Sequence, residues 1–218
     1  MNCIILFSAP AAGKGTISEY IKKKYNIDHI SASDVLRDGE KESSEYKKEI
    51  TDALDHGTFV DDDILLDLLR KKLVNQKQDF ILDGTPRTIN QANKIGILLD
   101  ELNICLSKVI YINVDRTVAE DRILNRLICT SCDSVYNKKI DDITNNKCKK
   151  CGNELSTRKD DSLEVYDFRY KTFVEKTKPL INYYKDKNLL YVVNNNSTII
   201  DAYNQIDDIL RRWKYDNN

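Results

Sequence analysis

Short apolar runs alternate with amphipathic stretches along the chain. The first run, residues 2–8 (NCIILFS), is continuous and ends at a turn that contains glycine, which is typical of a strand buried in a parallel sheet. Three further runs, DFILD, KVIYINV and LLYVVN, are each followed by a turn and a helical pattern. Strand, turn and helix repeated in this order predict a parallel sheet that is covered by helices on both faces.

Two of the segments between the strands have clear helical features. Residues 61–76 (DDDILLDLLRKKLVNQ) carry acidic residues in the first turn and basic residues later, as the helix dipole favours. Residues 33–57 are rich in helix formers and contain two glycines. We expect short helices there that break near Gly39 and stop at Gly57.

Composition excludes several classes of protein. The 218 residues are enough for one domain with insertions, and 34 basic against 35 acidic residues leave a net charge of -1. A balanced charge gives no global basic field of the kind that nucleic-acid-binding proteins carry. The apolar runs are far shorter than the roughly 20 residues of a membrane span. With no recognisable targeting segment, we expect a cytoplasmic protein with neither a nucleic-acid nor a membrane partner.

Four of the six cysteines form two Cys-x-x-Cys pairs that are separated by fifteen residues: Cys129, Cys132, Cys148 and Cys151. This spacing is typical of a structural zinc knuckle, and disulfides are rare in the cytosol. The polar segment between the pairs has few apolar anchors, so bound metal would replace a missing core. Because four protein ligands leave no coordination position open, the predicted Zn²⁺ is structural.

The other cysteines and the histidines carry no obvious chemistry. Cys3 and Cys105 lie in apolar surroundings, and we expect both to be small buried hydrophobic residues. His29 and His56 fall outside the segments with candidate chemistry. They are expected to be ordinary surface or boundary residues.

Residues 8–16 (SAPAAGKGT) follow the first predicted strand and precede a helix. This is the context of a phosphate-binding loop, in which backbone N–H groups and a helix N-terminus converge on an anion. Lys14 would then reach the β- and γ-phosphates. The general pattern has glycine at position 8 and Ser or Thr at position 15, where this chain has Ser8 and Gly15, followed by Thr16. On the loop alone, an ordinary turn between strand and helix therefore stays an alternative.

The ending GKGT resembles the loop of adenylate kinases and related nucleoside monophosphate kinases. Further segments resemble the family in the same order: SASDVLR, GTFVDDDIL, FILDGTPRTINQA, DRILNRL, STRKDD, RYKTF and KPLINYY. The resemblance covers essentially the whole chain and implies a P-loop α/β fold, a three-layer α/β/α arrangement around a central parallel five-stranded sheet. It also implies a division into a core (residues 1–30, 61–126 and 162–218), a helical monophosphate-binding insert (31–60) and a zinc-binding lid (127–161).

The resemblance further implies roles for individual residues. The catalytic residues would be Lys14, Arg87, Arg122, Arg126, Arg158 and Arg169. The ATP site would consist of Pro10, Ala11, Ala12, Gly13, Lys14, Gly15, Thr16, Arg122, Arg126, Tyr136, Asn195 and Ser197. The AMP site would consist of Ala32, Arg37, Phe59, Val60, Gly84, Arg87, Gln91, Arg158 and Arg169. Asp83 would orient water on Mg²⁺, while Asp160 and Asp161 would form hydrogen bonds at the hinges of the lid.

The chemistry of these residue types suits phosphoryl transfer. The reaction requires neutralised charge on the transferred group, in-line placement of two nucleotides and exclusion of water, and guanidinium groups bind phosphate bidentately. The amide of Gln91 can donate to and accept from an adenine edge, which favours AMP as acceptor. We therefore predict a monomeric, Mg²⁺-dependent adenylate kinase that converts ATP and AMP into two ADP, with GTP as an alternative donor.

The chain departs from the family pattern at Ser8, Ala11, Ala32, Ser33 and Thr85. If positions 8 and 11 require a positive φ, each replaced glycine would cost about 1 kcal/mol. Because the charged residues are retained, we favour an active enzyme over a nucleotide-binding pseudoenzyme. A third hypothesis treats the lysine-containing knuckle as a nucleic-acid-binding module, but no set of stacking aromatic residues accompanies it.

Overall fold

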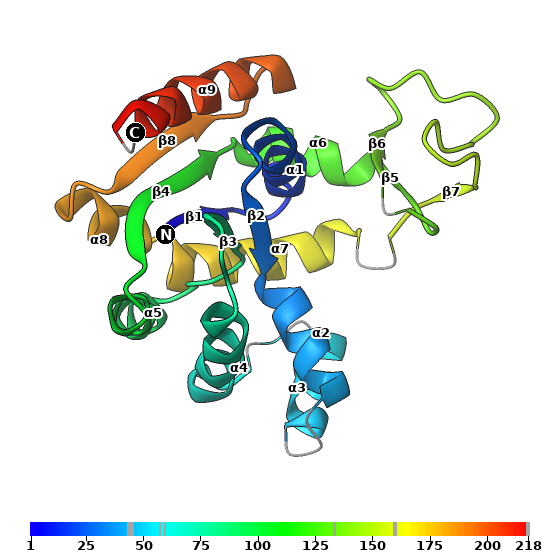
Figure 1. Cartoon of the computed structure of the whole chain (residues 1–218). Coiled ribbons are helices and arrows are strands. Elements are labelled where there is room, and N and C mark those ends of the chain that lie inside the picture. The colour runs from blue at the N-terminus through cyan, green and yellow to red at the C-terminus, as the bar shows by residue number, and fades with distance from the viewer. Residues whose placement is uncertain (43–45, 57, 59, 133, 159–160, 217–218) are drawn as a thin grey trace.

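A computed structural model describes residues 1–42, 46–56, 58, 60–132, 134–158 and 161–216. Its centre is a five-stranded sheet in the order β2-β3-β1-β4-β8 (Figure 1). The strands are β1 (Asn2–Ser8), β2 (Asp28–Ser31), β3 (Phe80–Asp83), β4 (Cys105–Asn113) and β8 (Leu190–Asn194). All four neighbouring pairs are parallel, so the predicted P-loop α/β fold with a five-stranded parallel sheet is confirmed.

Helices occupy most of the chain between the strands. They are α1 (Lys14–Tyr25), α2 (Ala32–Glu42), α3 (Lys47–His56), α4 (Asp62–Val74), α5 (Ile89–Glu101), α6 (Arg116–Leu124), α7 (Leu163–Thr172), the π-helix η1 (Phe173–Thr177), α8 (Leu180–Asp186) and α9 (Ile199–Asp216). Among the described residues, no helix is long and apolar enough to cross a membrane.

Alternate residues of β1 contribute to two separate cores. Cys3, Ile5 and Phe7 are buried together with apolar residues of α4, α5 and α8. Ile4 and Leu6 are buried together with residues of α1, α6 and α9. Because side chains of a strand alternate between the two faces, burial of every residue from 3 to 7 requires helices on both sides of the sheet.

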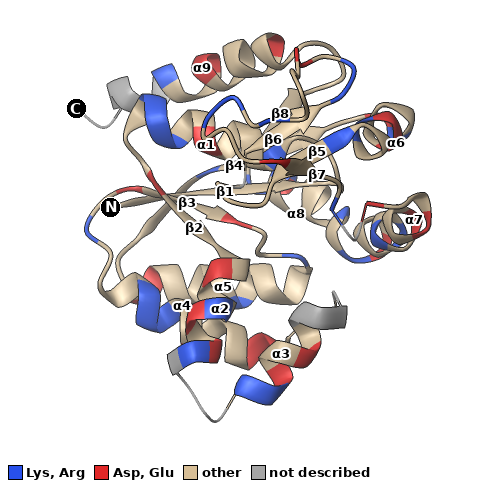
Figure 2. Ribbon diagram, turned by 90° about the vertical axis from the view of Figure 1, so that its right-hand side faces the viewer, with Lys and Arg blue, Asp and Glu red and all other residues tan. Residues whose placement is uncertain are grey.

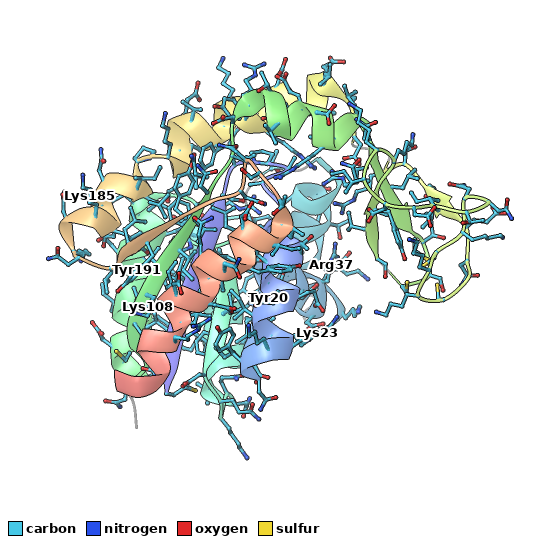
Figure 3. All side chains as sticks on the ribbon, turned by 90° about the horizontal axis from the view of Figure 1, so that it is seen from above. Tyr20, Lys23, Arg37, Lys108, Lys185 and Tyr191 are labelled. Carbon is cyan, nitrogen blue, oxygen red and sulfur yellow. The ribbon has the colours of Figure 1, made fainter. Side chains whose placement is uncertain are left out.

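The aromatic and basic residues at the sheet's margin strengthen the contact between its last elements. Tyr20 of α1 stacks on Tyr203 of α9, with ring centroids 3.8 Å apart. Lys108 of β4 is buried, and its Nζ lies 4.4 Å from the ring centroid of Tyr191 in β8 (Figure 3). Burial of the Lys108 charge is therefore compensated by a cation–π contact.

Two groups of elements project from the central sheet. Helices α2 and α3 lie beside α4, and the antiparallel strands β5 (Arg126–Cys129), β6 (Val135–Asn137) and β7 (Leu155–Ser156) form a small sheet at the other end (Figure 1). They fall largely within residues 31–60 and 127–161. Their movement as separate domains stays a prediction.

The predicted helix break near Gly39 is wrong. Helix α2 continues through this residue to Glu42. A Cβ atom at Gly39 would lie 2.5 Å from Cδ1 of Leu68 in α4. The glycine therefore allows α2 and α4 to pack closely, and the predicted stop at Gly57 lies outside the described residues.

Prediction was correct for one of the two isolated cysteines. Cys3 is fully buried, whereas Cys105 is exposed. Cys105 is the first residue of β4, and its N–H donates to the carbonyl of Met1 at the margin of the sheet. Its apolar neighbours in the sequence thus did not indicate its own burial.

Candidate active site

The predicted site residues gather beyond the carboxyl ends of the parallel strands, where open α/β sheets bind their ligands. The phosphate loop follows β1, Ala32 follows β2, Asp83 ends β3 and Asn195 follows β8. Helix α1 begins at Lys14, so its N-terminal N–H groups also face this edge. The strand order thus brings together segments that are far apart in the sequence.

The loop itself has two residues in the left-handed region. Ala11 has a φ of 59° and Gly13 a φ of 80°. The carbonyl of Gly13 accepts the N–H of Ile17 at 3.1 Å, which starts α1. Ser8 is the last residue of β1 and its hydroxyl donates to the carbonyl of Ala9. Strain from a missing glycine is therefore expected at Ala11 and not at Ser8.

We expect Ala11→Gly to stabilise the fold by about 0.5–1 kcal/mol. A left-handed non-glycine residue costs about 1–2 kcal/mol, and the extra freedom of glycine in the unfolded chain returns about 0.5–1 kcal/mol of this gain. The gain corresponds to a rise of about 2–4 °C in the midpoint of thermal unfolding. In the matched variant Ala9→Gly, φ is not positive, so that variant should be destabilised. A lower midpoint for Ala11→Gly would contradict the assignment of strain.

Asp83 is the buried centre of the site. It is 5% exposed and its carboxylate is paired with Lys14. His29 Nε2 lies 3.0 Å and the hydroxyl of Ser18 3.3 Å from Oδ2. Burial raises the pKa of Asp83, but the hydrogen bond from His29 and the charge of Lys14 outweigh it and lower the pKa below its usual value. Asp83 is therefore a carboxylate at neutral pH.

His29 is a residue of this site that sequence analysis missed. It lies in β2, which pairs in register with β3 so that Ser31 is opposite Asp83. The expected surface or boundary position is therefore wrong for His29, because its ring contacts the buried carboxylate. Recognition of β2 as the neighbour of β3 would have been the signal. The side chain of His56 lies outside the described residues.

Two predicted arginines border the phosphate loop and the small sheet. Arg122 donates through Nη2 to the carbonyl of Asn195 at 2.8 Å, and burial lowers its pKa. Arg126 makes two hydrogen bonds to the carboxylate of Asp161, of which Nε to Oδ2 measures 2.8 Å. This bidentate pair joins the start of β5 to the residues before α7. It therefore closes the base of the predicted lid.

Arg87 and Gly84 lie together on the monophosphate side. Arg87 donates through Nε to the carbonyl of Gly84 at 2.8 Å. Burial lowers the pKa of Arg87, the charge of Asp83 opposes this and the charge of Arg169 adds to it. A Cβ atom on Gly84, whose φ is 79°, would lie 3.7 Å from both Ala32 Cβ and Arg87 Nη2. The structure thus brings these five predicted residues into one neighbourhood.

Gln91 is buried and both ends of its amide are engaged. Its Oε1 accepts the backbone N–H of Arg87 at 2.7 Å, and its Nε2 donates to Oδ1 of Asp62 at 2.7 Å. The hydroxyl of Thr85 lies 3.4 Å from the same Oε1. Contact between Gln91 and an adenine base stays a prediction and would replace one of these partners.

The remaining predicted residues differ in their surroundings. Arg37 is exposed and donates to Asp34 at 3.1 Å (Figure 3). Exposed positions are also occupied by Gly15, Thr16, Arg158, Arg169 and Ser197, whereas Ala12 and Val60 are buried and Pro10 is half-buried. Phe59 and Asp160 lie outside the described residues. Basic and acidic residues are interspersed over the helices (Figure 2).

The four knuckle cysteines come together as predicted. Their Sγ atoms all lie within 4.8 Å of one another. Cys129 and Cys151 are 3.4 Å apart, and Cys132 lies 3.5 Å from Cys148. Four thiolates about 2.3 Å from a tetrahedral zinc ion would be about 3.8 Å apart, so this sulfur set fits such a metal.

Tyr136 belongs to the surroundings of these sulfurs. Its hydroxyl accepts the N–H of Lys149 at 3.0 Å and lies 3.2 Å from Sγ of Cys148. Since the oxygen already accepts one hydrogen bond, its own proton can point to the sulfur. A role of Tyr136 inside the knuckle is thus supported by contacts, while its predicted contact with ATP stays a prediction.

Comparison with known proteins gives matches over nearly the whole chain. A family model described as "Adenylate kinase" matches residues 6–189. An adenylate kinase of Thermosipho melanesiensis is 36% identical over 212 residues, which is 96% of this chain and 99% of the relative. An adenylate kinase of Archaeoglobus fulgidus is 36% identical over 221 residues, which is 98% of this chain and 100% of the relative. The similarity therefore includes the segments that project from the sheet.

Proposed function

Because the chain belongs to the adenylate kinase family, a family of phosphotransferases, we propose that it transfers a phosphoryl group reversibly from MgATP to AMP and so forms two ADP. The observation that carries the proposal is the convergence of the phosphate loop, Lys14 and the buried Asp83 at the carboxyl ends of the strands. No side chain is needed as a nucleophile, because a phosphate oxygen of AMP attacks the γ-phosphorus directly.

On the donor side, Lys14 and the loop would hold the phosphates of ATP. Lys14 would exchange Asp83 for the β- and γ-phosphates, and the backbone N–H groups at the start of α1 would add further donors. Arg122 and Arg126 border this region and would neutralise charge on the transferred group. Each interaction would strengthen as negative charge accumulates in the transition state.

Asp83 fits the second requirement, a hard cation. Mg²⁺ bound with ATP supplies charge neutralisation on the phosphate oxygens. Asp83 is ionised and buried beside the loop, so its carboxylate could hold water molecules of the hydrated ion. The hydroxyl of Thr16, in the first turn of α1, would be a further oxygen donor.

On the acceptor side, Arg87 and Arg37 would bind the phosphate of AMP. Arg87 is held beside Gly84, and Arg37 is exposed on α2. Gln91 would read the adenine edge with the amide that Asp62 and the Arg87 N–H now occupy. The donor base is less defined because Ser197 is exposed, so ATP and GTP must be compared directly.

Two inserts, residues 31–60 and 127–161, would close over the nucleotides and exclude water. The ion pair of Arg126 with Asp161 would act at the hinge of the second insert, and closure would bring Arg158 and Arg169 towards the phosphates. The four cysteines would hold a structural Zn²⁺ that stiffens this insert. Reduced thiols suit a cytoplasmic location, and the expected form is a monomer.

The test is an assay of ADP formation with Mg²⁺ over a panel of triphosphate donors and monophosphate acceptors. We expect turnover to be fastest with ATP and AMP and to be lost when Mg²⁺ is chelated. A Lys14→Met preparation made in parallel measures contaminating kinase from the expression host. Faster turnover with GTP would instead indicate a GTP:AMP phosphotransferase, and binding without turnover for any pair would indicate a pseudoenzyme.

A further inference from the structure

Asn195 is a buried polar residue in the loop between β8 and α9. It is 1% exposed, and its Nδ2 donates to the carbonyl of Ala12 at 2.8 Å. Its own carbonyl accepts from Arg122 at 2.8 Å, and its N–H donates to the carbonyl of Asn113 at 2.9 Å. Asn195 therefore connects the ends of β4 and β8 and helix α6 to the phosphate loop.

The bond to Ala12 fixes the orientation of one peptide group. A trans peptide is planar, with its C=O and N–H pointing in opposite directions. Because the Ala12 carbonyl points to Asn195, the N–H of Gly13 must point away from it, towards the open side of the loop. The next carbonyl, of Gly13, is bound to the N–H of Ile17, so both peptides around Gly13 are held.

The fit between Asn195 and the loop is close. A Cβ atom at Gly13 would lie only 2.7 Å from Nδ2 of Asn195 and 4.0 Å from Nη1 of Arg122. Asn195 Oδ1 and Arg122 Nη1 are both buried without a hydrogen-bond partner among the described residues. Buried polar groups without partners are uncommon and are typical of places where a ligand completes the bonding.

We propose that the Asn195 side chain is a positioning residue for the phosphate loop, which aims the N–H of Gly13 at a phosphate of the donor nucleotide. The inference rests on the proposed function, because it assumes a nucleoside triphosphate in this loop. Neighbouring Ala11 is in the left-handed region that a non-glycine residue disfavours. The loop therefore has a tendency to rearrange, and the hydrogen bond from Asn195 opposes it.

The test compares Asn195→Ala and the isosteric Asn195→Asp with a neighbouring control. Both variants remove the Nδ2 donor, and the loss of one buried hydrogen bond predicts a rise of about tenfold in the KM for ATP. The KM for AMP should stay within about twofold, because the acceptor residues do not contact Asn195. The control Asn196→Ala removes a hydrogen bond to the N–H of Asp115 in the same region and should leave both constants unchanged.

Calorimetric titration with ATP, without AMP, separates this inference from the proposed function. The variants should bind ATP about tenfold more weakly than the parent even if no turnover is measured. Equal ATP affinity in variants and parent, or an equal rise in the KM of both nucleotides, would overturn the positioning role. Thermal unfolding identifies a variant that fails to fold, and the isosteric Asn195→Asp then decides the result.

Discussion

Lys14→Met should reduce the rate of ADP formation by about a thousandfold, since it removes a charge that stabilises the transferred phosphoryl group. Lys14 is the first residue of α1, and its side chain is 28% exposed and held by Asp83. The lysine is therefore already placed at the helix N-terminus before nucleotide binds. Methionine keeps the length and apolar part of the side chain, so the loss should be in catalysis more than in folding.

The matched control for this experiment is Lys22→Met. Lys22 is exposed on the same helix, away from the loop, so its replacement should leave turnover unchanged. The measurement is the initial rate with ATP and AMP together with the midpoint of thermal unfolding. A Lys14→Met enzyme that kept more than about a tenth of the parent rate would contradict the assigned role.

Most of the fold could be predicted because four strands are continuous apolar runs. The residues of β1 and β3 are almost all buried, and such runs are visible without knowledge of their neighbours. Strand β2 was missed because only Ile30 of its four residues is buried, which leaves no apolar run and no clear alternation. The error extended to the site, since His29 could not be placed beside Asp83 without β2.

Pairwise contacts between distant segments could not be predicted from local patterns. The sequence placed Ala11 in the phosphate loop and raised the question of its φ, which the backbone answered. Nothing near Asn195 indicates that its amide binds Ala12, 183 residues earlier. Gly39 was taken as a helix breaker because its true function, contact with Leu68, depends on how α2 packs on α4. Local sequence thus predicts elements, while tertiary packing decides the partners.

Replacing Cys148 by serine should unfold the small sheet locally while the central sheet stays intact. The apolar cluster of this region consists of Leu127, Cys129, Cys148 and Leu155, with three partly buried residues beside it. A cluster of this size is too small to hold three short strands. Structural zinc contributes about 10–16 kcal/mol in zinc-finger peptides at pH 7, which is far more than so few side chains can supply.

Hydrogen exchange measures this effect directly, and we expect loss of protection in β5, β6 and β7 but not in β1 or β4. The control Cys105→Ser changes an exposed cysteine outside the cluster and should alter neither exchange nor zinc content. The parent protein, prepared without chelator, should contain about one equivalent of zinc. Less than about half an equivalent, or an unchanged exchange pattern in Cys148→Ser, would mean that hydrogen bonds and apolar contacts hold this sheet without metal.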